Sequence, residues 1–393
     1  MEHSDITFYF FVIFTGSAIL ATLAMFGRQP LLIAYIVLGA LLGPYGFEMI
    51  DDPGLISDLA HIGIVFLLYL LGLDMQPAKL VNMLRKATLV ALVSSAIFAF
   101  AGFSFASLFG YSDIESLVIG LAMMFSSTII GIKLLPTTAL HHKHVGELVT
   151  GLLLLQDLIA ILVLIAIQSL SSQAGNNTID WFAMVQPLFM LPLLILIAWA
   201  LVKWVLIPLL LKFDSIQEFM FLITIGWCLG LAELAKFMGL SQEIGAFVAG
   251  VTMALTPIAQ FVALTLKPLR DFFLVLFFFS LGASFNLDLL PLVWLPSLVL
   301  AALYLGLKPL VFRFLLFKLE ESQKMGWEVG FRLGQNSEFA LLVAFLALGT
   351  GMIGNEAAHV IQATAIITFL VSTYLVISRY PSPIAMSDKL RRD

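Results

Sequence analysis

The chain has 393 residues, of which 61% are hydrophobic and only 11% are charged, and its mean hydropathy is +1.05. Soluble domains carry roughly 25% charged residues, so this composition excludes an ordinary soluble enzyme and indicates a polytopic membrane protein. The net charge of −5 gives no reason to expect a nucleic-acid partner, and the one cysteine, Cys228, excludes an internal disulfide.

The apolar runs of the chain define its predicted helices. A membrane-spanning helix needs about 20 predominantly apolar residues. Runs separated by Gly, Pro and charged residues predict thirteen spans, namely 6–26, 30–47, 56–75, 87–108, 114–137, 147–169, 182–211, 217–236, 242–264, 269–287, 292–317, 325–350 and 357–379. The predicted fold class is therefore an all-α polytopic membrane protein.

The basic residues of the predicted loops fall on one side of the membrane. With the N-terminus outside, the inward loops and the C-terminal tail collect basic residues such as Arg28, Lys212 and Arg392, whereas the outward loops hold acidic residues such as Asp52 and Asp180. Because inward loops are enriched in Lys and Arg, we expect a multi-pass protein of the cell (inner) membrane with an outer N-terminus and a cytoplasmic C-terminus.

A carboxylate lies at the centre of the sixth predicted span, where Gln156 and Asp157 interrupt an apolar run. A charge at the bilayer midplane costs roughly 3 kcal/mol, so Asp157 is expected to have a partner or a task. Lys308 and Arg332 are the basic residues that also fall deep inside predicted spans.

Two other spans carry polar residues at about the same depth. The fifth has Ser126, Ser127 and Thr128 at its centre, and the twelfth has the segment 335–338. Both are predicted to be discontinuous helices, since unwound backbone is tolerated there when it lines a cavity or is buried in protein. The alternative is that the hydroxyls bond to their own helix and pack against neighbours.

The order of these features indicates an internal duplication. Glycine-rich strings at 39–43 and 245–250 lie in the second and ninth spans, and the broken fifth span corresponds in order to the broken twelfth. We expect one transmembrane transporter domain over 1–393, with inverted repeats at about 30–169 and 242–379, linking helices at about 182–236 and a short cytoplasmic tail at 380–393. The sequence contains no recognisable soluble nucleotide-binding domain.

The chain resembles the monovalent cation:proton antiporter-2 family, particularly its Kef-type potassium/proton members. Strings spread over nearly the whole chain carry this resemblance, at Tyr35–Pro44, Phe66–Asp74, Leu154–Asp157, Gly239–Gly250, Leu269–Gly282 and Ser337–Ala340. The resemblance implies a sodium/proton-antiporter-like fold with a dimerisation domain, a mobile core domain and two crossed broken helices. Asn336-Ser337 departs from the Gly-rich pair that is usual before the Glu-Phe of this family.

The resemblance also implies roles for particular residues. Gln156-Asp157 matches the ion-binding pair of the family, in which related electrogenic antiporters have two aspartates. Lys308 matches a membrane-embedded lysine that can neutralise this site, and Glu338 matches the acidic residue of the second broken helix. Many Kef-type proteins continue into a cytoplasmic nucleotide-binding regulatory domain. The resemblance of these 393 residues therefore implies nothing about the regulation that such a domain provides.

One midplane carboxylate can hold a proton or a monovalent cation but not both. Competition at Asp157, as the site faces each side in turn, predicts electroneutral one-for-one exchange of K⁺ or Na⁺ for H⁺. Gln156 is expected to supply a carbonyl ligand or to orient the carboxylate, and the hydroxyls of Ser126, Ser127 and Thr128 are expected to complete an oxygen shell.

The charged residues around this site have two interpretations. Lys308 is predicted to stabilise the ionised carboxylate while no cation is bound; the alternative is an Asp157–Lys308 pair that only fixes the helices. Arg332 and Glu338 lie six residues apart and are interpreted as structural groups that satisfy backbone and charge around the break, together with Asn336 and Ser337. His141, His142 and His144 are interpreted as part of a solvated basic loop, with a pH sensor as the alternative.

Other functions remain open at this stage. One is a sodium-coupled carrier of an organic anion on a similar fold, and a second is a cation channel. A third is a membrane sensor or structural protein without transport. No enzymatic activity and no cofactor are expected; the expected partners are K⁺ or Na⁺, H⁺, the lipid bilayer and a second copy of the chain, with no nucleic acid.

Overall fold

The structure is a computed structural model that describes residues 6–50, 52–74, 77–136, 144–171, 181–213, 216–256, 259–383, 385 and 390. All the regular elements in these ranges are helices, which confirms the predicted all-α fold. Each of the thirteen predicted spans overlaps one helix or consecutive helices.

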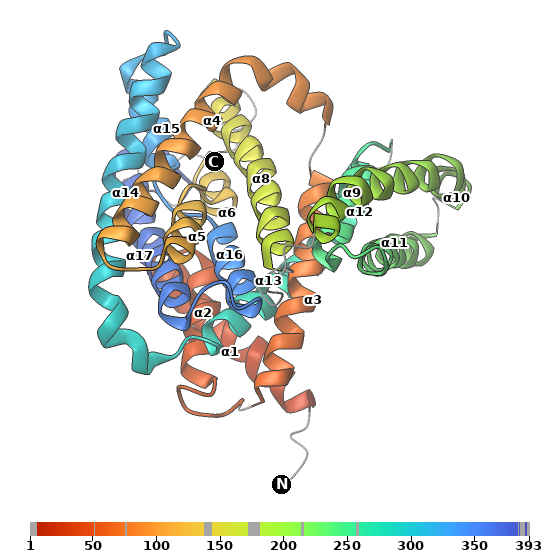
Figure 1. The fold of residues 1–393 in the computed structure, drawn as a ribbon, viewed down its shortest axis with the longest axis horizontal. Coiled ribbons are helices and arrows are strands. Elements are labelled where there is room, and N and C mark those ends of the chain that lie inside the picture. Colours follow the sequence, from red (N-terminus) through yellow and green to blue (C-terminus); the bar gives the residue numbers. More distant parts are fainter. Residues whose placement is uncertain are drawn as a thin grey trace. The chain divides into compact units, whose positions relative to one another are not determined.

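The helices are α1 (Ile6–Phe26), α2 (Leu31–Leu42), α3 (Pro53–Asp74), α4 (Pro77–Leu108), α5 (Asp113–Met123), α6 (Thr128–Lys133), α8 (His144–Ser171), α9 (Trp181–Leu201), the π-helical η1 (Val202–Leu206), α10 (Ile207–Lys212), α11 (Gln217–Phe237), α12 (Gln242–Ala254), α13 (Ala259–Ala283), the 3₁₀-helical η2 (Leu287–Leu289), α14 (Leu290–Lys318), α15 (Gln323–Arg332), α16 (Glu338–Gly349) and α17 (Asn355–Arg379). Figure 1 shows their order along the chain.

The described helices are suited to a bilayer. Eight of them are long and apolar enough to cross a membrane by length and composition. Large apolar side chains also point outward, among them Phe237, which is 89% exposed, and Leu108, which is 87% exposed. A soluble protein rarely exposes so many large apolar side chains, whereas lipid tails cover them without cost.

The structure confirms both predicted helix breaks and corrects one predicted span. Residues 124–127 separate α5 from α6, and residues 333–337 separate α15 from α16. The predicted span 242–264 is wrong at its end, because α12 ends at Ala254 and α13 begins at Ala259. Pro257 follows Thr256 in the sequence and disfavours helical conformation in the residue before it. The apolar residues 259–264 therefore belong to the next helix.

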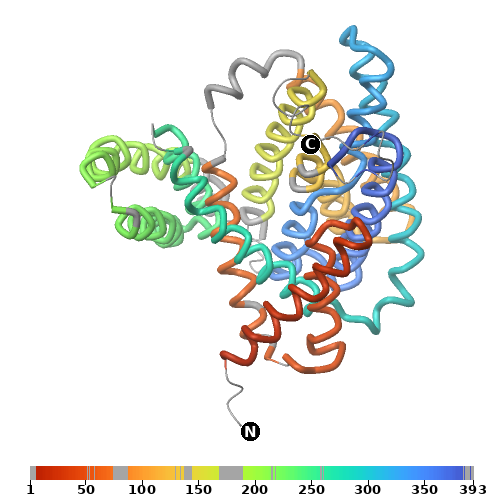
Figure 2. The backbone as a smooth tube through the Cα atoms, turned by 180° about the vertical axis from the view of Figure 1, so that it is seen from behind, coloured from red at the N-terminus to blue at the C-terminus, as the bar shows by residue number. Residues whose placement is uncertain are grey.

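The chain divides into two compact units. The first unit comprises residues 1–50, 82–167 and 281–393, and the second comprises residues 51–81 and 168–280. The division into repeats at 30–169 and 242–379 stays a prediction. Within the first unit, α14 packs beside α15 and α17, and α16 packs beside α5 and α17; α14 and α17 lie side by side in both views (Figures 1 and 2).

The core of the second unit is the contact between α3 and α12, where two helix backbones touch. A Cβ atom on Gly250 would lie 2.0 Å from the carbonyl oxygen of Tyr69, and one on Gly72 would lie 2.6 Å from that of Phe247. Small residues permit this close approach of helices in membranes. His61 and Glu243 add an ion-pair contact between the same helices, with 3.4 Å between Nε2 and Oε1.

Gly250→Ala is therefore expected to destabilise the protein by about 1–3 kcal/mol, since an added methyl group forces the helix backbones apart. Cys228 is the one cysteine and is fully buried in the second unit, so the temperature at which a thiol-reactive dye labels it reports the unfolding of this unit. Gly226→Ala is the matched control, because a Cβ there has no atom within 4 Å. Equal melting temperatures for the two variants would contradict the prediction.

Candidate functional site

The first helix break is held by a glutamine of α8. After α5 ends at Met123, the backbone N–H of Ser126 donates to Oε1 of Gln156 over 3.1 Å. The next serine, Ser127, caps α6, because its Oγ accepts from the N–H of Ile130 at 3.1 Å. Serine is a preferred N-cap residue, so the local sequence explains where the second half-helix begins.

The second break also ends at a serine N-cap, and it bonds to the first break. Ser337 caps α16 by accepting from the N–H of Phe339 at 3.1 Å. Oγ of Ser126 donates to the carbonyl oxygen of Leu333 at 2.8 Å. Nε2 of Gln335 donates to the carbonyl oxygen of Ser127 at 3.4 Å. The two unwound segments therefore satisfy part of each other's backbone, as buried irregular backbone requires.

Asp157 lies beside the first break and is only 1% exposed. Both of its carboxylate oxygens are 3.0 Å from Oγ1 of Thr128, the first residue of α6. The carboxyl group of Glu338, the first residue of α16, interacts with it electrostatically. Among the three hydroxyls of the first break that the sequence singled out, that of Thr128 contacts the carboxylate, whereas Ser126 and Ser127 bond to backbone groups.

Gln156 is fully buried, and one end of its amide bonds to the break. Its Oε1 accepts from Ser126, and its Nε2 has no hydrogen-bond partner among the residues that the structure describes. The carbonyl end thus orders the backbone of the break, and the N–H₂ end is available to a water or a further acceptor. Because an amide does not ionise, Asp157 is the titratable member of this pair.

Lys308 of α14 connects the two breaks and is fully buried. Its ammonium donates to the carbonyl oxygen of Phe125 at 2.6 Å, to that of Gln335 at 2.9 Å and to Oδ1 of Asn336 at 3.1 Å. The rings of Phe98 and Tyr304 lie 5.7 and 5.6 Å from Nζ. These three acceptors are all neutral oxygens. The predicted role of Lys308 in stabilising the ionised carboxylate of Asp157 stays a prediction.

Arg332 ends α15 and is 1% exposed. Its guanidinium donates to Oε1 of Glu328 at 2.8 Å and to the carbonyl oxygens of Leu134 and Pro381, also at 2.8 Å each. Leu134 directly follows α6. Arg332, at the end of α15, therefore joins the end of α6 and the segment after α17 through hydrogen bonds. Its carboxylate partner is Glu328 rather than Glu338.

Several residues of this site were missed in the sequence. Thr368 of α17 accepts from the N–H of Asn336 at 3.1 Å, and Ser372, four residues later, donates to Oε1 of Gln335 at 2.9 Å. Their spacing of four residues places both on one face of a helix, and this pattern in the sequence could have indicated a polar face directed at the break. Glu328 is four residues before Arg332, a spacing that favours a salt bridge on a helix.

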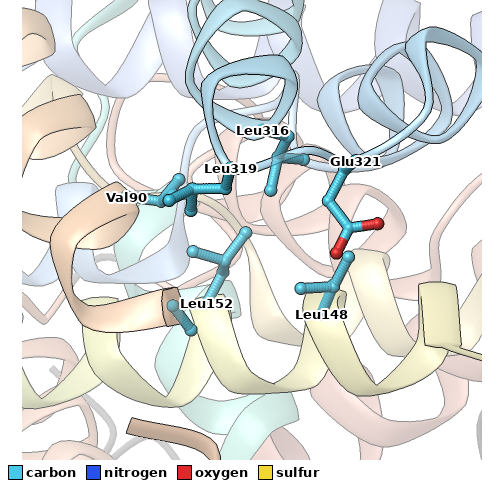
Figure 3. A pocket seen from close by; sticks show the side chains of 7 residues that line it. Val90, Leu148, Leu152, Leu316, Leu319 and Glu321 are labelled. Carbon is cyan, nitrogen blue, oxygen red and sulfur yellow. The ribbon is translucent and has the colours of Figure 1, made fainter. Parts of the chain in front are cut away.

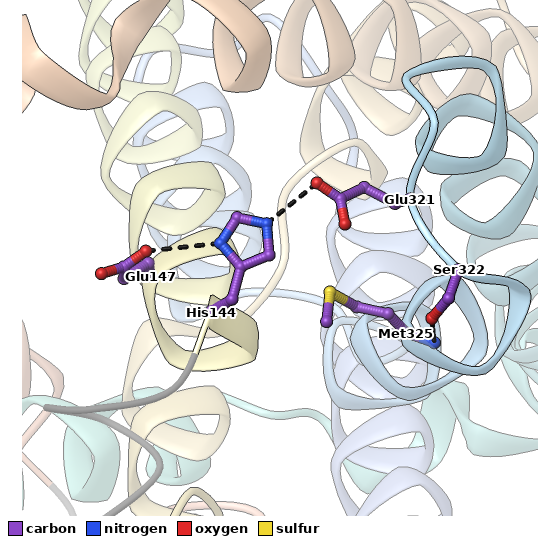
Figure 4. Close-up of polar contacts among 5 residues, drawn as sticks. All are labelled: His144, Glu147, Glu321, Ser322 and Met325. Atoms are coloured by element: carbon purple, nitrogen blue, oxygen red, sulfur yellow. Dashed lines mark hydrogen bonds and ion pairs between the residues drawn. The ribbon is translucent and has the colours of Figure 1, made fainter.

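A second polar cluster lies at the beginning of α8 (Figure 4). The Nδ1 atom of His144 is 3.3 Å from Glu147, and its Nε2 atom is 2.9 Å from Glu321, which follows α14. Only the doubly protonated ring can donate to both carboxylates. His141 and His142 lie outside the described residues.

Glu321 also lines a small pocket, whose other lining residues are apolar and come from α4, α8 and the end of α14 (Figure 3). Apart from this carboxylate, the pocket offers no polar group to a transported ion.

The sequence of the chain is similar to known transport proteins. The family model described as sodium/hydrogen exchanger, transmembrane, matches residues 11–377. K(+) efflux antiporter 5 of Arabidopsis thaliana is 28% identical over 375 residues, which cover 92% of this chain and 64% of that protein. The putative cation/proton antiporter YbaL of Escherichia coli (strain K12) is 26% identical over 91% of this chain and 65% of its own length. The chain therefore spans less than two thirds of the length of these relatives.

The fold is also similar to a solved structure. The sodium proton antiporter MjNhaP1 from Methanocaldococcus jannaschii, determined at pH 8, matches with a TM-score of 0.68 and 17% identity over 94% of this chain and 95% of that one. At this identity the match concerns the fold alone. It confirms the predicted sodium/proton-antiporter-like fold.

Proposed function

Because the chain belongs to the sodium/hydrogen exchanger family, whose model matches residues 11–377, we propose that it is a secondary active transporter that exchanges a monovalent cation for a proton. The observation that carries this proposal is the buried carboxylate of Asp157, which lies beside a break in one helix and bonds to a hydroxyl at that break. A carboxylate in such a place binds either H⁺ or a monovalent cation.

The proposed mechanism is alternating access at Asp157. When the site faces one side, the carboxylate loses its proton and accepts a cation from that side; facing the other side, it releases the cation and takes up a proton. Oγ1 of Thr128, 3.0 Å from the carboxylate, is a further oxygen for the cation. Because Gln156 cannot ionise, one charge is carried in each direction, and we propose that exchange is electroneutral.

We propose K⁺ as the preferred cation and Na⁺ as the alternative. The relatives from Arabidopsis are named K(+) efflux antiporters, and the solved neighbour is named a sodium proton antiporter. We further propose that the protein lies in the cell membrane with an outer N-terminus, as the distribution of basic residues in its loops suggests, and that it forms a homodimer, as the family resemblance implies. A transporter of this kind needs neither a cofactor nor an enzymatic activity.

A sodium-coupled carrier of an organic anion is less consistent with the site. Such a carrier needs basic groups that face the substrate. Among the described residues of the first unit, the buried lysine and arginine side chains are Lys308 and Arg332, and protein oxygens already accept from both. A cation channel would need polar groups along a whole pore. The polar residues of the two breaks instead gather at one place, the crossing, where the two unwound segments bond to each other.

The proposal is tested by proton flux in proteoliposomes. The purified protein is reconstituted with a pH-sensitive dye inside, and K⁺, Na⁺ or choline is added outside. We expect an internal pH change with K⁺, a smaller or equal one with Na⁺ and none with choline. Setting the membrane potential with a gradient of a lipophilic cation such as tetraphenylphosphonium, which is not a substrate of the site, should leave the K⁺-driven rate unchanged. No cation-dependent flux would refute antiport, and a current that scales with potential would refute electroneutrality.

Thr128→Val is expected to raise the KM for the cation roughly tenfold with kcat nearly unchanged, because it removes one oxygen from the site but keeps the side-chain shape. Thr128→Ser keeps the hydroxyl and should restore the parental KM. Both constants come from the initial rates of the same proteoliposome assay. A valine variant with the parental KM would show that this hydroxyl does not contact the ion.

A further inference from the structure

Asn336 of the second break is fully buried, and its hydrogen bonds reach three different helices. Its side-chain oxygen, its side-chain nitrogen and its backbone N–H each contact a residue of a different helix. Its Oδ1 accepts from Lys308 of α14 at 3.1 Å, its Nδ2 contacts Sδ of Met123 of α5 at 2.9 Å, and its backbone N–H donates to Thr368 of α17 at 3.1 Å.

The bond from Lys308 completes the hydrogen bonding of a buried ammonium. An ammonium group has three N–H donors. Two of them are taken by the carbonyl oxygens of Phe125 and Gln335, one at each break, and Asn336 takes the third. All three acceptors are neutral, so the charge is held without using either carboxylate of the crossing.

The two carboxylates lie close to these acceptors along the chain. Thr128, which bonds to Asp157, comes three residues after Phe125, and Glu338 comes three residues after Gln335. An N–H of a charged group left without an acceptor in a buried place is unfavourable, and charge-assisted bonds to carboxylates are the stronger ones. Asp157 and Glu338 interact electrostatically with each other, so both belong to the same crossing. An ammonium that turned to Asp157 would compete directly with the transported cation.

We infer that Asn336 is a positioning residue for exchange: by accepting the third hydrogen bond of Lys308, it keeps the ammonium off Asp157 and leaves that carboxylate to the cation. This inference rests on the proposed function, because it concerns the affinity of the same site. Asn336 thus raises the affinity of Asp157 for the cation indirectly, by holding Lys308 in place.

The test compares KM and kcat in variants that separate the contacts of Asn336. Asn336→Ala is expected to raise the KM for K⁺ roughly tenfold while kcat changes little, since it removes the acceptor of a bond from a charged group. Asn336→Asp keeps an acceptor for Lys308 and should have a KM at or below the parental value. Met123→Leu removes the partner of Nδ2, leaves Oδ1 in place and should have the parental KM.

A second measurement covers variants that transport poorly or do not fold. The cation-dependent rise in melting temperature, measured in detergent with K⁺ against choline, reports binding without transport; it should shrink in Asn336→Ala and in Asn336→Ser, whose short side chain lacks the reach of Oδ1. An unchanged KM in Asn336→Ala, or an equal increase in Met123→Leu, would overturn the inference. Parental protein without any cation-dependent flux would instead refute the proposed function.

Discussion

Asp157→Asn is expected to reduce cation-driven proton flux to the level of empty liposomes while the protein stays folded. The amide has nearly the shape of the carboxylate, so its Oδ1 can still accept from Thr128. It carries no charge to attract a cation and takes up no proton at the pH of the assay. Initial rates with K⁺ and Na⁺, together with the melting temperature of each protein, measure the effect.

The matched control is Glu338→Gln, which neutralises the other carboxylate of the crossing. Glu338 stands at the first position of α16, where a negative charge is favoured by the helix dipole, so we expect this variant to retain flux with a changed KM. Flux in Asp157→Asn would remove this residue from the mechanism. Loss in Glu338→Gln with retention in Asp157→Asn would transfer the ion site to α16.

The sequence was sufficient to locate the elements of this site. Membrane spans are readable because every backbone group in lipid must be satisfied within a helix, and a polar run inside an apolar span therefore marks a break. That reasoning placed the breaks at 126–128 and at 335–338, and the structure has them within a few residues of these positions, at 124–127 and 333–337. Asp157 was conspicuous for the same reason, as a charge in an apolar run.

The partners within the site were less predictable, because they depend on the crossing of segments far apart in the sequence. Nothing in the sequence says that Ser126 bonds to Leu333, or that Arg332 reaches the carbonyl oxygens of Leu134 and Pro381. Serine in a break is equally suited to an ion ligand and to a helix cap. Only the three-dimensional arrangement distinguishes Thr128, which contacts Asp157, from Ser127, which caps α6.

Lys308→Met is expected to destabilise the first unit strongly. It retains most of the buried volume but leaves the carbonyl oxygens of Phe125 and Gln335 without the ammonium that donates to them. Each buried acceptor left unsatisfied costs about 1–3 kcal/mol, so a loss of roughly 2–6 kcal/mol is expected for the two. Thermal loss of helicity in detergent, measured by circular dichroism, gives the change in stability; an unchanged melting curve would contradict this role.

Combining Lys308→Met with Asp157→Asn separates two roles of the lysine. If Lys308 chiefly compensated the charge of Asp157, removing it alone would leave an uncompensated buried charge, and neutralising Asp157 as well would recover much of the stability. The three neutral acceptors of the ammonium predict the opposite. The double variant should melt no higher than Lys308→Met, because its two breaks have lost the same cross-link. Recovery in the double variant would identify Lys308 as the counter-charge of the ion site, and a shared melting temperature would identify it as the group that joins the two broken helices.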